Sequence, residues 1–196
     1  MKKSFLLVLC SMIINFGFAQ SWTAEQLSKS ATAKDIECLT QAEKDAIMYI
    51  NLARMFPKEF VKFELENYQA PIKFGTYLKN SSYKKSLITE LNKQKSMAAL
   101  TFENVLYEDA KCFATEMGDR GEIGHARIKC KESNYAECCS YGMETGKDIA
   151  MQWLIDHDVQ GVGHRLNCLE PTYTKIGLAI HTHKKWQVCA VAEMNF

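Results

Sequence analysis

The sequence predicts an α+β domain built in layers, because segments with helical periodicity come first and segments with strand periodicity come last. Apolar residues recur at spacings of three and four through residues 41–55, 103–118 and 144–156, which is typical of amphipathic helices. Residues 175–196 instead alternate in two runs, IGLAIHTH and WQVCAVAEM, separated by a pair of lysines. This alternation predicts a β-hairpin at the C-terminus.

Local signals fix several helix starts. Thr40 followed by Glu43 is a capping box, in which a hydroxyl and a carboxylate satisfy free amides of the first helical turn. Pro57 disfavours helical geometry at the residue before it and suits the first turn of a new helix. Ser81 or Ser82 is placed to cap a further helix. The N-terminal half is therefore expected to be rich in helices.

The first nineteen residues are typical of a secretory signal, with two lysines, an apolar run, and small residues before a predicted cleavage after Ala19. Two alternatives stay open, an uncleaved anchor and a lipoprotein modified at Cys10. The apolar core is shorter than the roughly 20 residues that a spanning helix needs. Cleavage would leave a secreted or periplasmic protein without a membrane span, and the lysine-rich signal is typical of a bacterial source.

Residues 20–196 fit the size of one domain. Residues 20–39 are expected to be a loosely held N-terminal extension, because residues 21–36 are polar and lack clear periodicity. The domain itself is predicted over residues 40–196. Repeats and low-complexity stretches are absent from the sequence.

The charge balance argues against nucleic acid as a partner. The chain has 24 basic and 23 acidic residues, and loss of the two signal lysines leaves 22 against 23, a formal charge of −1. Nucleic-acid binding normally requires a basic stripe that neutralises phosphates. We therefore expect a small-molecule or protein ligand instead.

Cysteine usage indicates disulfides. Seven cysteines follow the predicted cleavage point, so at least one thiol is unpaired or intermolecular. No C-x-x-C pair exists, which argues against a zinc ribbon and a thioredoxin-like motif. The adjacent pair Cys138 and Cys139 is poorly placed to bond to itself. Each is expected to pair elsewhere, with candidates Cys130, Cys168 and Cys189.

Several fragments, in order, resemble the CAP superfamily of cysteine-rich secretory, antigen 5 and pathogenesis-related 1 proteins (SCP domain), in its bacterial secreted type. They are INLARMFPKEF, LTFENVLYEDAKCFATEMGDRG leading to GH, then AECCSYG, WLID, GHRLN, IGLAI and W-x-V-C-A. Their order and spacing extend over residues 44–196. The resemblance implies a three-layer α-β-α sandwich with a central antiparallel sheet and a large cleft.

The resemblance also implies a set of two histidines and two acids in that cleft. His125 in EIGH and His164 in GVGHR match the family's histidines. Glu137 in AECC and Asp156 in WLID match its acids. Two departures stand out: Cys138 occupies the place of an asparagine, and Asp156 replaces a glutamate, which shortens its reach by one methylene.

Two imidazoles and two carboxylates support two kinds of chemistry. They are suitable ligands for Zn²⁺ or another divalent cation, and His125, His164, Glu137 and Asp156 are the tentative metal ligands. A neighbouring thiolate is a further candidate ligand. The same groups also suit a carboxylate–histidine network without metal, and no cofactor is required. Neither HExxH nor its inverted form is present.

Other polar and aromatic residues have structural interpretations. His181 and His183 share one face of a predicted strand, which we expect to be solvated. His157 is expected at the surface, at the end of a helix. Arg54 is expected to tie loops down through its five donors. Trp153 and Trp186 are expected to be core anchors.

Three functions remain at this stage. The leading hypothesis is a secreted binding or interaction module whose His/acid cleft takes a divalent metal and an unidentified ligand, such as a lipid, another small molecule or a protein. One alternative is a peptidase-like cleft hydrolase that uses His125, Glu137, Asp156 and His164 as catalytic residues. It lacks a convincing nucleophile, because Ser140 follows two cysteines and G-x-S-x-G is absent. The other alternative is a purely structural surface module.

Overall fold

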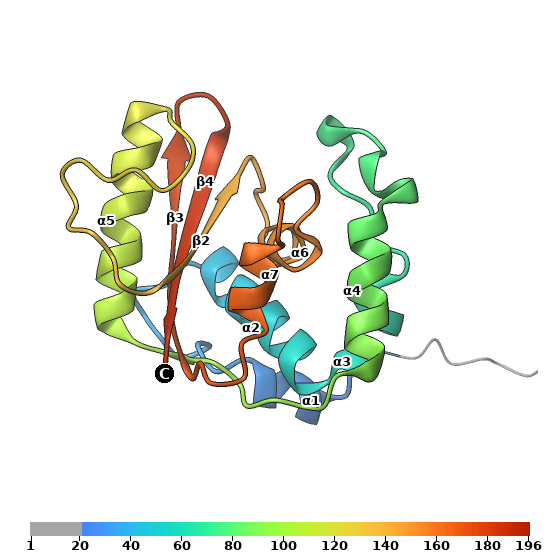
Figure 1. The fold of residues 1–196 in the computed structure, drawn as a ribbon. Coiled ribbons are helices and arrows are strands. Elements are labelled where there is room, and N and C mark those ends of the chain that lie inside the picture. The colour runs from blue at the N-terminus through green and yellow to red at the C-terminus, as the bar shows by residue number, and fades with distance from the viewer. Residues whose placement is uncertain (1–20) are drawn as a thin grey trace, which may run out of the picture.

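The computed structural model describes residues 21–196, so the predicted signal peptide, residues 1–19, lies outside the described residues. A four-stranded sheet forms the centre of the structure, with the strand order β1-β3-β4-β2 (Figure 1). The strands are β1 (Thr101–Phe102), β2 (Ala136–Tyr141), β3 (Lys175–His183) and β4 (Gln187–Asn195).

The three long strands are antiparallel, as the resemblance implied. Strands β3 and β4 form the predicted C-terminal hairpin, and β2 pairs with the other edge of β4. The sheet differs from the expected antiparallel one only at the short strand β1, which runs parallel to β3 and makes the sheet mixed. Only Thr101 and Phe102 pair in this way, since the chain turns into a helix at Asn104.

Helices cover both faces of the sheet, which confirms the three-layer α-β-α arrangement (Figure 1). Helix α5 (Asn104–Arg120) lies against β3 and β4 on one face. The opposite layer contains α2 (Gln41–Met55), α4 (Ser82–Lys93), α6 (Gly146–Ile155) and α7 (Gly163–Cys168). Shorter segments complete it: α1 (Ala24–Ser30), α3 (Pro57–Phe60), the π-helical turn η1 (Val61–Leu65) and the 3-10 turns η2 (Ile72–Phe74) and η3 (Tyr77–Asn80).

Two glycines allow α5 to approach β3 closely. A Cβ at Gly177 in β3 would lie 2.0 Å from the backbone nitrogen of Tyr107. A Cβ at Gly118 in α5 would lie 2.1 Å from the carbonyl oxygen of Thr182. Real Cβ atoms do not tolerate such distances, so the spacing between this helix and the sheet depends on both glycines.

The prediction of a loosely held N-terminal segment is wrong. Residues 24–30 form α1, and Ser30 at its end is completely buried. The buried amide of Asn51 in α2 donates to the carbonyl of Ser30 and to the hydroxyl of Thr32, both at 3.0 Å. A local signal for α1 was present, because Thr23 and Gln26 form a capping box at its start. Only the burial of its end depends on contacts from α2.

The predicted helix starts agree with the structure. Thr40 and Glu43 form the capping box of α2, and Ser81 caps α4. The second carboxylate oxygen of Glu43 accepts a hydrogen bond of 2.8 Å from the backbone nitrogen of Ile180 in β3. One buried acid therefore caps a helix and ties it to the central sheet.

One disulfide, Cys112–Cys130, joins α5 to the long loop that follows it. This bond shows that Cys130 is not the partner of Cys138 or Cys139, contrary to one of the pairings considered from the sequence. Cys138, Cys139, Cys168 and Cys189 are buried free thiols, and Cys38 is an exposed one. The prediction that Cys138 and Cys139 each form a disulfide with another cysteine is therefore wrong for the described residues.

Arg54 at the end of α2 connects this helix to two distant segments. Its side chain is completely buried, and its guanidinium donates four hydrogen bonds of 2.8–2.9 Å to backbone carbonyls. The structural role expected from the sequence is confirmed. The four acceptors belong to Ala98, Cys168, Glu170 and Tyr173.

We expect Arg54→Met to lower the free energy of unfolding by at least about 3 kcal/mol, because four backbone carbonyls lose the buried guanidinium that donates to them. Chemical denaturation of both proteins measures the difference. Lys58→Met, which removes an exposed cation from the adjacent helix, is the matched control and should change stability by less than about 0.5 kcal/mol. Equal losses in the two variants would contradict this account of Arg54.

Candidate functional site

A buried carboxylate holds the loop that carries His125. Glu116 in α5 accepts hydrogen bonds from the backbone nitrogens of Ile128 at 2.6 Å, Lys129 at 3.1 Å and Cys130 at 2.9 Å. Burial opposes its ionisation, yet these amides and Arg120 together lower the pKa of Glu116. The loop is therefore fixed from α5 by an ionised acid and by the disulfide at Cys130.

Tyr141 fixes the same loop from the sheet. The backbone nitrogen of Gly124 donates to the Tyr141 hydroxyl at 2.7 Å, and Gly124 has a φ of 100°, which favours glycine. The next residue, His125, is thereby held beside β2. Sequence spacing gives no signal for this contact, because the two residues belong to different elements.

His125 and Glu137 form the first carboxylate–imidazole pair. Nδ1 of His125 lies 2.5 Å from Oε1 of Glu137, which projects from β2. The hydrogen bond that His125 donates to Glu137 raises the pKa of His125, although burial opposes this. Burial also opposes ionisation of Glu137, but hydrogen bonds from His125, Glu193 and Arg127 lower the pKa of that carboxyl. An ionised Glu137 therefore fixes the ring of His125 through Nδ1.

Arg127 connects Glu137 to two more acids. Its guanidinium bonds to the other oxygen of Glu137, to Oε1 of Glu193 at 2.5 Å and to Asp109 at 3.1 Å, and it lies over the ring of Phe113. Three carboxyl groups thus surround one cation. Burial and the Glu137 carboxylate raise the pKa of Glu193 to about 9, so this carboxyl keeps its proton at neutral pH.

Asp156 and His164 form the second pair. Oδ1 of Asp156 lies 2.7 Å from Nδ1 of His164, and Oδ2 accepts the backbone N–H of His164 at 2.9 Å. Asp156 ends α6 in a left-handed conformation and is almost completely buried. The shorter acid therefore still reaches its histidine, because the chain turns directly at Asp156.

The two pairs lie side by side. The ring centroids of His125 and His164 are 6.3 Å apart. Each ring uses Nδ1 for its carboxylate, and neither Nε2 has a hydrogen-bond partner among residues 21–196. The structure thus brings together the four residues expected from the sequence, as two pairs with free Nε2 atoms.

Two adjacent cavities flank these pairs. The larger, of about 650 Å³, includes His164 and Asp156, and the smaller, of about 420 Å³, includes His125 and Glu137. The larger cavity has a mainly apolar lining. Its aromatic residues are Phe74, Tyr77, Tyr141 and Trp186.

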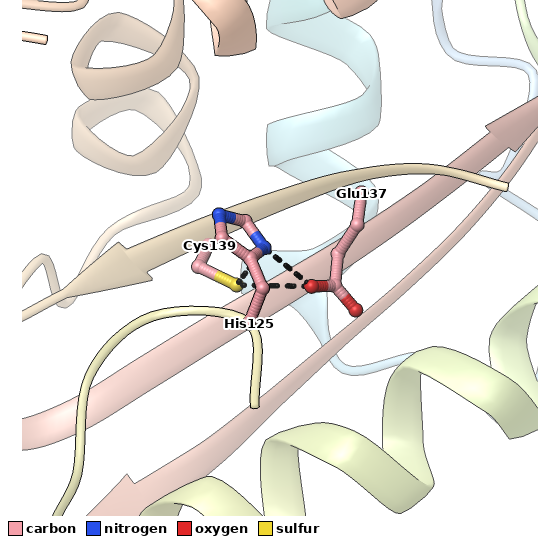
Figure 2. A group of neighbouring side chains, drawn as sticks. All are labelled: His125, Glu137 and Cys139. Carbon is pink, nitrogen blue, oxygen red and sulfur yellow. Dashed lines mark hydrogen bonds and ion pairs between the residues drawn. The ribbon is translucent and has the colours of Figure 1, made fainter. Parts of the chain in front are cut away.

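Cys139 lines the larger cavity and lies close to the His125–Glu137 pair. Its Sγ is 3.8 Å from both Nδ1 of His125 and Oε1 of Glu137 (Figure 2). Its side chain is buried, and burial together with the Glu137 charge raises the pKa of this thiol well above its ordinary value. Cys138 instead places its Sγ 3.7 Å from the carbonyl oxygen of His164. Adjacent strand residues point to opposite faces, so the two thiols have different surroundings.

The other histidines and Trp186 correct several expectations. His183 is buried, and its Nε2 lies 2.8 Å from the carbonyl of Glu122, so it is not solvated, whereas His181 on the same face is only partly buried. His157 follows the end of α6, as expected, but it is only partly exposed, and its Nδ1 lies 2.8 Å from the Ser81 hydroxyl. Trp153 is a core anchor as expected, but Trp186 is 44% exposed at the larger cavity.

Sequence reasoning missed Arg127, Glu193 and Glu116, which position the first pair. One signal was available for Glu193, because it is a charged residue inside the apolar strand run VCAVAEM. A completely buried acid needs a partner, which points to a cation elsewhere in the chain. That cation, Arg127, is 66 residues away, so spacing alone does not identify it.

The profile of the cysteine-rich secretory protein family (CAP) matches residues 48–194. The chain belongs to this family. Members of the CAP family are typically extracellular. None of the described helices is long and apolar enough to cross a membrane.

Comparison with solved structures gives more distant similarities. An outer surface protein from Borrelia burgdorferi has 17% identity and a TM-score of 0.41, over 58% of this chain and 88% of that one. BmVAL-1 has 18% identity and a TM-score of 0.48, over 82% of this chain and 80% of that one. A search of curated proteins found no match.

The protonated state of Glu193 predicts a pH dependence of stability. Its folded pKa of about 9 exceeds the roughly 4.3 of an unfolded glutamate. Between these two pH values the unfolded chain releases a proton that the folded protein keeps. The free energy of unfolding therefore falls as pH rises through this range.

We expect Glu193→Gln, which mimics the protonated acid beside Arg127, Glu137 and Asp109, to weaken this dependence. Melting temperatures of the metal-free proteins from pH 5 to about pH 9 measure it. Relative to the variant, the wild type should lose stability as pH rises. Glu66→Gln, at an exposed position, is the control and should follow the wild type. Parallel curves for wild type and Glu193→Gln would show that Glu193 is ionised.

Proposed function

We propose that this CAP-family chain is a secreted binding protein whose cleft takes a small ligand with an apolar body and a divalent cation. The observation that carries the proposal is the pair of carboxylate-held imidazoles beside the 650 Å³ cavity. A cavity of this volume, mostly apolar with a few convergent polar groups, is typical of small-molecule sites.

The lining supports an apolar ligand body with one polar end. Tyr77 and Trp186 are partly exposed at the cavity, so a ligand that covers them would bury aromatic surface. Burial of apolar surface stabilises a complex by roughly 25 cal/mol per Å² before ordering costs. His164 lies on the same cavity and offers a free Nε2 to the polar end.

The His/acid set supports a divalent cation. Imidazole nitrogen and carboxylate oxygen both bind Zn²⁺, and metal-bound histidines commonly have a carboxylate on their other nitrogen. The cation can bind in either of two ways. An ion can bind at the free Nε2 atoms, or it can replace the proton between His125 and Glu137.

The two alternatives have less support. Ser140 is buried and its hydroxyl donates to Gln152, and the thiol of Cys139 is buried with a raised pKa, so neither is an activated nucleophile. A hydrolase would have to use one of the imidazoles to activate water. Imidazoles that only braced loops would use both nitrogens, yet both Nε2 atoms lack partners among the described residues.

We expect the protein to bind Zn²⁺ with micromolar affinity, about −8 kcal/mol, and the His125→Ala/His164→Ala variant to lose this binding. Calorimetric titration of the protein with its Cys112–Cys130 disulfide formed is the measurement. His181→Ala, on the hairpin, is the control and should bind as the wild type does. Equal binding by the double variant would contradict a cation site at these histidines and would redirect the search to metal-free ligand binding.

A further inference from the structure

We propose that His125, Glu137 and Cys139 form a thiolate-containing metal site, a proposal that rests on cation binding by the cleft. Its three donor atoms, one nitrogen, one oxygen and one sulfur, all lie within 4.8 Å of one another (Figure 2). They come from a loop and from two positions of β2 that share a face. His164 and Asp156 then remain a separate pair that faces the ligand.

The spacing of the donors fits a tetrahedral ion. Bond lengths of about 2.0–2.3 Å place neighbouring ligand atoms roughly 3.3–3.8 Å apart. The two distances from Sγ of Cys139 to its neighbours are both 3.8 Å. The third, between His125 and Glu137, is 2.5 Å because a proton now lies between them. Replacing this proton with an ion requires that edge to open, and His125 lies on a loop with 58% of its side chain exposed.

The surrounding charge favours a cation. Asp109 and Glu137 both contact the single guanidinium of Arg127, so two carboxylates face one base. The protonated Glu193 also contacts this guanidinium but adds no charge. Arg127 also bonds to the oxygen of Glu137 that faces away from His125, which orients the other oxygen toward the site. Carboxylates that bind metals are normally oriented by such hydrogen bonds from surrounding groups.

Cys139 is suited to be the third ligand. Its side chain is buried, yet its thiol makes only long contacts of 3.7–3.8 Å, to Gly124, His125 and Glu137. Residue 139 also lines the larger cavity, so the fourth coordination position is open to water or to the polar end of a ligand.

Binding changes the protonation of two residues. The Cys139 thiol loses its proton to solvent and its thiolate bonds to the ion. The Nδ1 proton of His125 is replaced by the ion, and Nε2 takes up a proton, so the ring stays neutral. A soft thiolate favours Zn²⁺, Co²⁺ and Cd²⁺, whereas Mg²⁺ and Ca²⁺ prefer oxygen ligands.

Co²⁺ is the probe, because a cobalt–thiolate bond gives a charge-transfer band in the near ultraviolet. Titrations use a Cys38→Ser background, which removes the exposed thiol. We expect the band in this protein and its loss in Cys139→Ser, with affinity at least tenfold weaker. Excess Mg²⁺ should leave the band unchanged. Cys138→Ser is the matched control, with the adjacent buried thiol removed, and should keep the band.

His164→Ala separates this inference from the proposed function. The thiolate site predicts that this variant keeps the band. Circular dichroism of Cys139→Ser and of a second variant, Cys139→Ala, establishes that these proteins are folded, so that loss of the band is not loss of folding. Three results overturn the inference but leave a cation site. Co²⁺ can bind without a thiolate band, or it can bind Cys139→Ser with the same affinity as the parent protein. The third result is loss of the band in Cys138→Ser or in His164→Ala. Absence of both Co²⁺ and Zn²⁺ binding overturns the cation part of the proposed function as well.

Discussion

The functional site depends on one repeated interaction, a mostly buried carboxylate that holds Nδ1 of a histidine. Glu137 provides it for His125 and Asp156 for His164, at 2.5 and 2.7 Å. An imidazole fixed at one nitrogen presents the other in a defined direction. The arrangement of strands, helix ends and loops around the cleft serves to place these two acids and their histidines.

The two acids are held by different means. Asp156 needs only local structure, because it ends α6 and also accepts backbone N–H groups at the start of α7. Glu137 depends on long-range contacts, since Arg127 and Glu193 meet it from the loop and from β4. The His125 side is therefore more sensitive to charge changes than the His164 side. This asymmetry is consistent with cation binding on one side and ligand binding on the other.

Local patterns predicted much of the fold. The capping box at Thr40, the helix of residues 41–55 and the C-terminal hairpin depend on neighbouring residues and agree with the structure. The four cleft residues came from the family resemblance, and the structure brings them together as two pairs that the resemblance did not give. The burial of His183 was missed because it depends on residues distant in the sequence. Helix α1 was missed although Thr23 and Gln26 form a local capping box at its start.

Arg127 marks the limit of sequence reasoning at the site. Nothing in its neighbourhood distinguishes it from other loop arginines, and its role follows only from the acids that the fold brings to it. Cys139 is similar, because the sequence predicted a disulfide between it and a cysteine elsewhere in the chain, whereas it is a buried free thiol. The alternation of β2 instead directs one thiol toward the histidines and the other toward α7.

The tautomers of the cleft histidines, measured by nitrogen-15 NMR of the metal-free protein at a pH where the rings are neutral, test this account most directly. We expect a protonated Nδ1 and a bare Nε2 in His125 and His164. His183 is an internal control with the opposite tautomer, because its Nδ1 accepts backbone N–H groups from Lys185 and Trp186. A protonated Nε2 in either cleft histidine would contradict the account.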